Sequence, residues 1–385
     1  MNATLARPPE AEGSPVTIGV VSLTAYGLFV PGSARRYGGS EVQLARLCRA
    51  VAARPGYHVV LITSGEGPFT TILVDGVEVR KLPWRPDAGS RGKLLLAWRL
   101  RREIARLAPD LYVQRCLGIE TGLVGSECRR RGVPFIYMTA SDWDCDGTYD
   151  RERPAWITRI SHRGMRAADL ILTQTERHRA MLRATYGLES KVLPSLCDLP
   201  TPAPWPRAHW LWVGRCEQSK RPDLFLDLAQ AFPAESFVLI APVGNDPALF
   251  ESIRARARQL SNVRFLAGVP YHEMDQYYRA AKGLINTATQ EGFPNVFLEA
   301  SKHGAPILSL AVNPDEYLTR HAAGICVSGD WQAMKSQLSA WCSDETTLAK
   351  MGESGRHYIA QHHATERVLQ AFLSHLHSLL TRPKT

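Results

Sequence analysis

The chain has 385 residues, of which 45% are hydrophobic and 22% charged, a composition typical of globular proteins. Its length suits two domains of ordinary size, since single cores rarely grow past about 250 residues. No apolar run approaches the roughly 20 residues that a transmembrane helix needs, and the first residues lack the apolar core of a secretory signal. We therefore expect a cytoplasmic protein.

The formal charge of +9 lies almost wholly in residues 1–190. Such a basic half favours anionic partners, which include phosphates, nucleic acid and an acidic membrane surface. The eight cysteines are scattered singly, without a CxxC pair or a Cys/His cluster at ligand spacing. We therefore expect reduced thiols, no structural zinc and no metal.

Residues 1–15 read as a disordered lead. From Val16 onward, short apolar runs alternate with amphipathic ones, a pattern typical of parallel βα units. The first predicted helix covers 40–53. The strands predicted for a first domain over 16–192 cover 16–23, 58–64, 110–116, 134–140 and 170–175.

Residues 193–209 carry five prolines and are predicted to form a linker, because proline neither continues a helix nor donates to a sheet. The βα alternation restarts over 210–355 as a second domain. Residues 356–385 are predicted to form a terminal helix that crosses back to the first domain. The predicted fold is α/β, with two Rossmann-like doubly wound domains facing across a cleft, and ligands bind beyond the carboxyl ends of such strands.

Residues 90–107 (SRGKLLLAWRLRREIARL) form a predicted helix with six basic residues and a broad apolar side. Two interpretations stay open. The helix packs its apolar face on the sheet and leaves arginines outside, or it contacts an anionic lipid surface as an amphipathic element.

The stretch EGFPNVFLEASKHGAPIL, residues 291–308, follows a predicted strand and runs into a helix that starts near Pro294 or Asn295. Glu291 then lies in the loop and Glu299 about one turn inside the helix. The backbone N–H groups from Phe293 to Phe297 would point out of the helix N-terminus, a favourable place for a diphosphate. Without further context, the two glutamates would read as a cap and a solvated helix residue.

This stretch resembles the signature of the retaining, GT-B fold glycosyltransferases of family 4, also called group 1. In that family one glutamate contacts the donor sugar, and another, eight positions later, binds the nucleotide ribose. The resemblance assigns these roles to Glu291 and Glu299. It also implies residues that line the sugar and the diphosphate, namely Gly292, Phe293, Asn295 and Val296.

The stretch WVGRCEQSKRPDLFLDLA, residues 212–229, resembles the family's loop at the first strand of the nucleotide domain. There an arginine and a lysine hold the leaving diphosphate, which implies Arg215 and Lys220. Fixed cations at that point stabilise the negative charge that builds on the departing phosphate. Outside this context both would read as ordinary surface cations.

The stretch RRYGGSEVQLARL, residues 35–47, matches the family's Gly-Gly loop beside the donor phosphates. Gly38 and Gly39 would allow close backbone approach, and Ser40 is expected to cap the helix. By analogy with a loop of the family, the donor base is expected near Gly268 and Val269 together with Pro270.

The sequence departs from the family after the strand at 134–140. Many members carry a histidine there, whereas this chain reads TASDWDCDG. Asp142 is the candidate catalytic residue, and Ser141 and Asp144 are candidates on the acceptor side. Asp142, Asp144 and Asp146 alternate, but no calcium loop with a closing glutamate follows, so no metal site is predicted.

The resemblance implies an enzyme that moves a hexosyl-type group from a UDP-, GDP- or ADP-sugar to an acceptor hydroxyl, with retention. The acceptor is a glycan, a lipid-linked saccharide or a small molecule, as in polysaccharide biosynthesis. No cofactor is expected besides the nucleotide-sugar co-substrate. An anionic membrane surface, reached through 90–107, is the further expected partner, with attachment at the inner face of the membrane.

Two alternatives remain. A nucleotide-sugar epimerase, which needs no acceptor, or a glycoside phosphorylase, which needs inorganic phosphate, could use the same scaffold. A basic nucleic-acid-binding protein would instead show aromatic stacking positions beside basic residues. No such motif is present, so we expect no nucleic acid partner.

Overall fold

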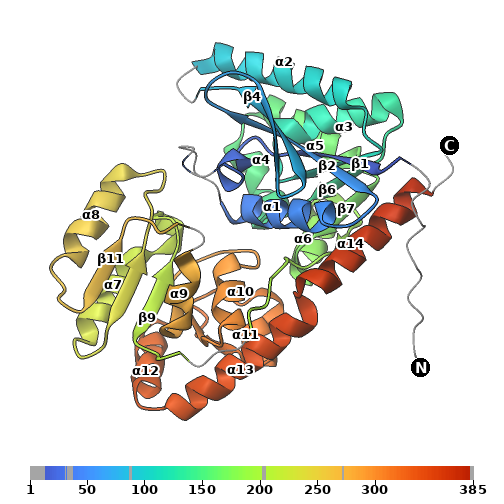
Figure 1. Cartoon of the computed structure of the whole chain (residues 1–385). Helices are drawn as coiled ribbons and strands as arrows, with labels where there is room; N and C mark the ends of the chain where they lie inside the picture. The colour runs from blue at the N-terminus through green and yellow to red at the C-terminus, as the bar shows by residue number, and fades with distance from the viewer. Residues whose placement is uncertain are drawn as a thin grey trace, which may run out of the picture. The chain divides into compact units, whose positions relative to one another are not determined.

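The computed structural model describes residues 14–30, 32, 38–85, 89–201, 205–270 and 273–381. The predicted disordered lead lies outside the described residues, apart from residues 14 and 15. The chain forms two compact units (Figure 1). Unit 1 comprises Met1–Gln174, His178–Leu196 and Leu369–Thr385, and unit 2 comprises Thr175–Arg177 and Cys197–Val368.

Unit 1 holds an eight-stranded sheet of order β3-β4-β2-β1-β5-β6-β7-β8. All neighbours are parallel except β3 and β4. The strands are β1 (Val16–Val21), β2 (Tyr57–Gly65), β3 (Thr70–Val74), β4 (Val77–Pro83), β5 (Leu111–Arg115), β6 (Phe135–Met138), β7 (Leu170–Thr173) and β8 (Lys191–Val192).

The β3–β4 hairpin is an addition to the predicted elements. Its two-residue turn is Asp75-Gly76, and both residues have positive φ, at 50° and 77°. This is the geometry that an Asp-Gly pair favours between antiparallel strands. The hairpin places an exposed strand at the sheet edge, where the Leu73 side chain is 73% exposed.

Helices cover both faces of this sheet, as expected for parallel strands that are buried on two sides (Figure 1). They are α1 (Gly39–Ala52), α2 (Gly89–Leu107), α3 (Ile119–Arg131), α4 (Thr148–Glu152), α5 (Ala155–Arg166), α6 (Glu176–Tyr186) and the later turns of α14 (Thr365–Leu380). From α14, Phe372 lies in an apolar pocket with Val20 and Leu44. The backbones of α3 and α5 touch, because a methyl group at Gly164 would overlap the Thr121 carbonyl.

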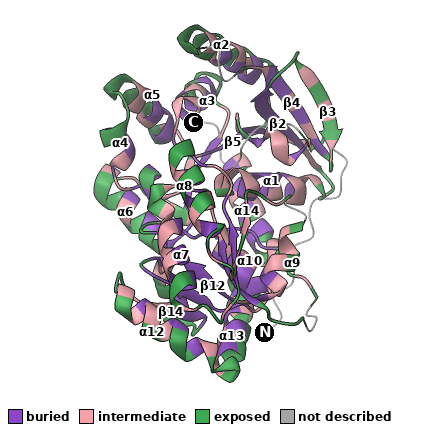
Figure 2. Ribbon diagram, turned by 90° about the vertical axis from the view of Figure 1, so that its left-hand side faces the viewer, coloured by how far each residue is buried: buried purple, intermediate pink, exposed green. Residues whose placement is uncertain are grey.

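Helix α2 presents apolar side chains on two opposite faces. Leu96, Leu100 and Ile104 are buried against unit 1, as the packing interpretation predicts. On the outer face, however, Leu94 is 71% and Trp98 57% exposed, and Figure 2 shows buried and exposed residues alternating along the helix. Within the described residues, no helix is both long and apolar enough to cross a membrane.

Unit 2 holds a six-stranded parallel sheet of order β11-β10-β9-β12-β13-β14. The strands are β9 (His209–Val213), β10 (Phe237–Ile240), β11 (Val263–Leu266), β12 (Ala281–Asn286), β13 (Ile307–Ser309) and β14 (Gly324–Cys326). The helices are α7 (Pro222–Ala231), α8 (Pro247–Ala257), α9 (Met274–Arg279), α10 (Asn295–Lys302), α11 (Tyr317–Arg320), α12 (Trp331–Cys342) and α13 (Glu345–His362).

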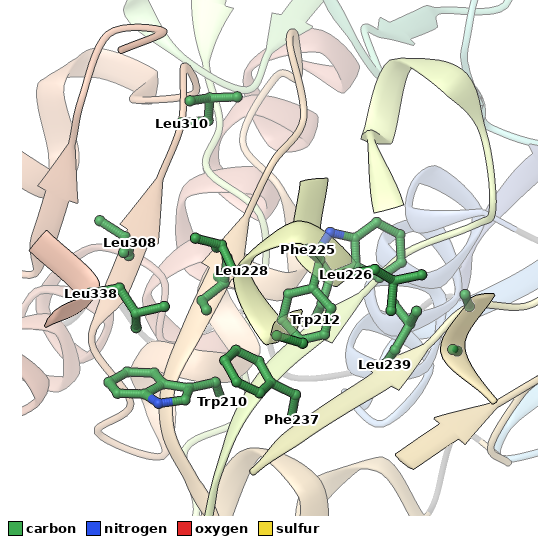
Figure 3. Packing of buried hydrophobic residues seen from close by; sticks show 14 of the residues in the cluster. Trp210, Trp212, Phe225, Leu226, Leu228, Phe237, Leu239, Leu308, Leu310 and Leu338 are labelled. Atoms are coloured by element: carbon green, nitrogen blue, oxygen red, sulfur yellow. The ribbon is translucent and has the colours of Figure 1, made fainter. Parts of the chain in front are cut away.

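Aromatic side chains fill the core on one face of this sheet (Figure 3). The rings of Phe225 and Phe237 meet edge to face, with centroids 5.5 Å apart. Trp210 is fully buried, and its indole Nε1 donates to Glu235 at 2.9 Å. The Trp210 indole thus keeps a hydrogen-bond partner for its buried donor.

All eight cysteines lie among the described residues, and none forms a disulfide. Burial raises the pKa of most of these thiols, to about 12 for Cys48 and about 11 for Cys216. Burial also raises the pKa of Cys128. These thiols are therefore protonated near neutral pH.

Candidate active site

The loop after β9 carries Arg215 and Lys220, and two buried side chains fix its course. The Trp212 indole donates to Thr287 Oγ1 at 2.9 Å, and this hydroxyl donates to the carbonyl oxygens of Lys220 and Arg221, each at 2.8 Å. Arg221 adopts a left-handed φ of 51°, directly before Pro222 starts α7. The loop is thus tied to the end of β12, the strand beside β9.

That tie brings the two main motifs together. Lys220 Nζ lies 2.8 Å from Glu291 Oε2, and the two side chains are 22% and 18% exposed. The Thr289 N–H supports the pair by donating to Ser219 O at 3.0 Å. A lysine and a carboxylate therefore meet at the carboxyl ends of adjacent strands, where ligands bind in open α/β sheets. Arg215 is more exposed, at 47%, and its Nη1 lies 3.3 Å from Glu217 Oε1.

Helix α10 starts at Asn295, with Pro294 as its N-cap. The prediction that the N–H groups from Phe293 to Phe297 all point outward is wrong at two positions. Pro294 has no N–H, and the Phe297 N–H donates to Pro294 O at 3.0 Å to close the first turn. The Phe293 ring is buried against Tyr317 and His363, so only its backbone could line a ligand.

Glu299 is held by a lysine that the motif did not single out. Lys302 Nζ lies 2.6 Å from Glu299 Oε2 and 3.1 Å from Asp275 Oδ1, and the lysine side chain is only 7% exposed. Burial alone would lower the pKa of Lys302, but Glu299 and Asp275 raise it. The His303 ring, whose Nε2 lies 3.1 Å from Asp275 Oδ1, and then Lys302 hold the pKa of Asp275 well below its usual range. The cluster therefore keeps Glu299 beside a fixed positive charge.

Gly268 and Val269 follow β11, at the far edge of the same row of strand ends. Gly268 is exposed, and no atom of the described residues lies within 4 Å of the position that a Cβ would take. The Val269 side chain is half-buried against the apolar cluster beneath it. This surface has room for a flat ring.

In unit 1, Gly38 and Gly39 lie at the start of α1. The prediction that Ser40 caps this helix is wrong, because the helix already begins at Gly39 and Ser40 lies in its first turn. Glu41 closes the turn instead. Its Oε2 accepts from the Gly38 N–H and from Ser40 Oγ, both at 2.8 Å, and its Oε1 accepts from Thr24 Oγ1 at 2.7 Å.

The aspartates after β6 are each engaged by different groups. Asp142 Oδ1 lies 2.8 Å from His178 Nε2 of α6, and both side chains are buried. The Asp144 carboxylate accepts from the Leu117 N–H at 3.0 Å and from the Ala140 N–H at 2.5 Å. Asp146 Oδ1 accepts from the Thr148 N–H at 2.8 Å. The described residues contain no group of three side chains that could hold a metal ion.

His178 is a residue that sequence reasoning missed. The family position after β6 lacks its histidine, but α6 brings an imidazole to the neighbouring Asp142. The two residues are 36 positions apart, so no local spacing signals the pair. Ser141 precedes Asp142 in extended backbone, as the N-cap of the short helical turn over Asp142–Asp144.

Comparisons with known proteins cover both units. Residues 38–194 match the glycosyl transferase 4-like domain, and residues 206–358 match the glycosyl transferases group 1. A D-inositol 3-phosphate glycosyltransferase from Frankia alni is 32% identical over 319 residues, which cover 71% of this chain and 78% of that protein. The chain belongs to the family 4, or group 1, glycosyltransferases.

Further relatives agree with this membership. A D-inositol 3-phosphate glycosyltransferase from Kribbella flavida is 26% identical over 91% of this chain and 93% of its own length. Among solved structures, sucrose-phosphate synthase from Thermosynechococcus elongatus has a TM-score of 0.79 at 17% identity, covering 94% of this chain and 99% of its own. An α,α-trehalose-phosphate synthase (UDP-forming) from Burkholderia vietnamiensis has a TM-score of 0.66 at 12% identity, covering 94% and 100%.

These findings confirm the predicted fold class and activity class. The chain consists of two α/β domains with parallel-dominated sheets, as in the GT-B glycosyltransferases, and it is a glycosyltransferase. The family signature lies in unit 2, where Glu291 and Glu299 flank the start of α10. The roles of individual residues belong to the proposal that follows.

Proposed function

We propose that this family 4 glycosyltransferase moves a sugar from a nucleoside diphosphate sugar to an acceptor hydroxyl, with retention of configuration. The observation that carries the proposal is the Lys220–Glu291 pair at the ends of β9 and β12. Unit 2 then acts as the donor domain and unit 1 as the acceptor domain. The trehalose-phosphate synthase neighbour is described as UDP-forming, so UDP-sugars are the first donors to test.

In this proposal, different residues of unit 2 contact different parts of the donor. Lys220 and Arg215 neutralise the departing diphosphate, because fixed cations stabilise charge that develops in the transition state. Glu291 accepts hydrogen bonds from hydroxyls of the sugar, and Glu299 accepts them from the ribose. The base rests on Gly268 and Val269. The remaining donor contacts are assigned to Gly292, Phe293, Asn295 and Val296, and in unit 1 to Gly38 and Gly39.

The proposed reaction breaks the bond between C1 of the sugar and the diphosphate oxygen and forms a bond from C1 to the acceptor oxygen. The proton of the acceptor hydroxyl passes to the leaving diphosphate. Both events occur on one face of the sugar, so configuration is retained without a covalent intermediate. Asp142 is the proposed catalytic residue of unit 1, and His178 fixes its orientation. Ser141 remains an acceptor-side candidate. Asp144 is not carried forward, because main-chain donors occupy its carboxylate.

Thermal shift with UDP, GDP and ADP tests the donor assignment. A nucleotide at 100 times its dissociation constant adds about 2.7 kcal/mol of stability, and Lys220→Ala and Glu299→Ala should lose most of this response. Lys282→Ala is the matched control, because Lys282 forms a 2.7 Å ion pair of similar exposure with Glu235 at the other end of β12. If no nucleotide stabilises the protein, or if the control loses the response equally, the assignment is wrong.

We also propose that α2 contacts an anionic membrane surface at the inner face of the membrane. Leu94, Leu95 and Trp98 project outward from this helix. Exposed cations flank them, namely Arg91, Lys93, Arg101, Arg102 and Arg106. Apolar side chains framed by cations suit the boundary between lipid headgroups and acyl chains.

Co-sedimentation with vesicles tests the contact. We expect binding to vesicles that contain phosphatidylglycerol and none to neutral vesicles. The Leu94→Ser/Trp98→Ser double variant should abolish binding, whereas Leu73→Ser, which changes an exposed leucine on β3, should leave it intact. Equal binding by both variants would exclude α2 as the contact.

A further inference from the structure

Arg115 is a buried cation without a counterion in the described part of unit 1. It ends β5, and its side chain is 6% exposed. In the amide orientation that satisfies its neighbours, the Gln174 side-chain oxygen accepts from Arg115 Nη2 at 2.5 Å and from Ser195 Oγ at 3.2 Å. Arg115 Nε has no hydrogen-bond partner among the residues that the structure describes. Among the described residues, no carboxylate oxygen lies within 4 Å of the guanidinium group.

Two carboxylates act on Arg115 from a greater distance, and both are already occupied. They are Asp144 and Glu41. The Asp144 oxygens accept from the main chain at Leu117 and Ala140, and those of Glu41 accept from Thr24, Gly38 and Ser40. Neither can turn toward the guanidinium group without abandoning hydrogen bonds that close a loop or a helix start.

A buried guanidinium group in this setting is costly to the folded protein. Arginine stays protonated in proteins, so it cannot escape burial by losing its charge. Buried charges are therefore normally paired, and an unpaired one destabilises the fold. The next residue adds strain, because Cys116 has a left-handed φ of 73° without being glycine. Uncompensated charge and backbone strain at the end of a parallel strand are typical of ligand sites.

The surroundings favour an anion as the missing partner. Cys116, which follows Arg115, interacts with Ser40 in the first turn of α1. Glu41 of the same turn also acts on the charge of Arg115, so the N-terminal turn of α1 and the guanidinium group lie in one neighbourhood. Both attract negative charge, the helix through its dipole and the arginine through its fork of N–H donors.

We propose that Arg115 binds a phosphate group of the acceptor substrate. The inference rests on the proposed transferase function and deepens it by assigning the acceptor class, a phosphate ester, and the residue that recognises it. The guanidinium fork is suited to a phosphate, which offers several oxygens in the matching geometry. The acceptor phosphate would supply the counterion that the guanidinium group lacks among the described residues.

The melting temperature of an Arg115 variant distinguishes a ligand-binding arginine from one that only supports the fold. In the ligand-free protein, Arg115→Met removes an uncompensated buried charge and should leave the melting temperature unchanged or higher. Arg129→Gln, at an exposed arginine of α3, is the control. A marked fall in melting temperature for Arg115→Met alone would assign Arg115 to the fold and overturn the proposal.

Phosphate binding is measured with UDP present at saturation, so that the donor site is closed to phosphate. The probes are inorganic phosphate, a soluble inositol or hexose monophosphate, and short-chain phosphatidylinositol. We expect at least one to stabilise the wild type and the Arg129→Gln control, and Arg115→Met to lose that response. The strongest probe identifies the source of the phosphate. No stabilisation of the wild type, or an equal response from Arg115→Met, overturns the proposal.

Kinetics separates this inference from the proposed function. Arg115→Gln should raise the KM for a phosphorylated acceptor roughly 10- to 100-fold, the loss expected for a charge-assisted hydrogen bond. Arg115→Lys should restore part of it, and the affinity for UDP should not change. If UDP binds but Arg115→Gln leaves the acceptor KM unchanged, only the Arg115 inference fails. If no nucleotide binds at all, the proposed function fails.

Discussion

The two units hold their polar candidate residues in different ways. In unit 2, Glu291 and Glu299 are each held by a partly or largely buried lysine at 2.8 Å or less. In unit 1, Asp144 is held by main-chain N–H groups and Asp142 by a buried histidine. Lysine pairs can reopen to admit a ligand, whereas a carboxylate that anchors two loops cannot leave them. The candidate carboxylates of unit 2 are therefore paired with side-chain cations, whereas Asp144 of unit 1 is part of the frame that holds two loops.

The largest expected effect follows from breaking the lysine pair. Lys220→Met should lower kcat roughly 100- to 1,000-fold, because it removes a cation that stabilises the charge developing on the leaving diphosphate. Glu291→Gln and the double variant complete a cycle, in which the double loss should fall well short of the product of the single losses. Steady-state kinetics measures it, with Lys282→Met as control. If the kcat loss of the double variant equals the product of the two single losses, Lys220 and Glu291 act independently.

Acid should weaken unit 2 before unit 1. Burial lowers the pKa of His209 to about 4, whereas an unfolded histidine titrates near 6.5. Between these values the unfolded state binds the extra proton, so this contribution to the free energy of unfolding falls by up to about 3 kcal/mol as pH drops from 6.5 to 4.

In unit 1, burial lowers the pKa of His162 and of His375 less than that of His209. Asp144 has the opposite sign. Burial raises the pKa of Asp144, so its folded state binds a proton before the unfolded state and gains relative stability as pH falls. Hydrogen exchange followed by mass spectrometry at pH 7 and pH 5 should show faster opening of unit 2 peptides at pH 5. Faster opening of unit 1 alone would contradict the expectation.

A smaller effect is expected when the frame of unit 1 is weakened. Asp144→Asn keeps the shape but leaves one main-chain donor poorly matched, which should cost about 1–3 kcal/mol of unfolding free energy. UDP affinity should stay at the wild-type value, because no donor contact is assigned to Asp144. Urea unfolding and calorimetric titration measure the two quantities. A large loss of UDP affinity without a loss of stability would place Asp144 in the binding site.

The smallest expected effect concerns Lys302. Lys302→Met should raise the donor KM about tenfold and leave kcat nearly unchanged, because Glu299 loses the charge that holds it but no reacting atom is touched. Discrimination between UDP and its 2′-deoxy and 3′-deoxy analogues should shrink in the same variant. Asp275→Asn should give a weaker form of both changes. Undiminished discrimination would remove Lys302 from ribose recognition.

The proposed donor residues could be picked out from local motifs. The eight-residue spacing of Glu291 and Glu299 and the loop that carries Lys220 could be read from sequence because each lies within one βα connection. Lys302 was readable too, since it lies three residues after Glu299 on the same helix face. The Glu41 contact with Gly38 follows the capping pattern, although the sequence-based reading assigned the cap to Ser40.

The acceptor half could not be predicted in this way. Asp142 meets His178 across 36 residues, and Arg115 meets Gln174 across 59, because separate strands deliver them to one edge of the sheet. Such contacts depend on strand order, which a single sequence does not display. The β3–β4 hairpin, in contrast, could have been predicted, because its Asp-Gly turn is a local signal. The sequence-based prediction of parallel βα units did not include it.

The buried thiols give each unit a built-in probe of how often its structure opens. Only a thiolate reacts with an alkylating reagent, and burial keeps Cys128 of unit 1 and Cys216 of unit 2 protonated and enclosed. Each sulfur therefore becomes reactive only when its own surroundings open. The rate at which each cysteine peptide gains the mass of the reagent would report the opening of each unit separately, in the wild-type protein and without an added probe.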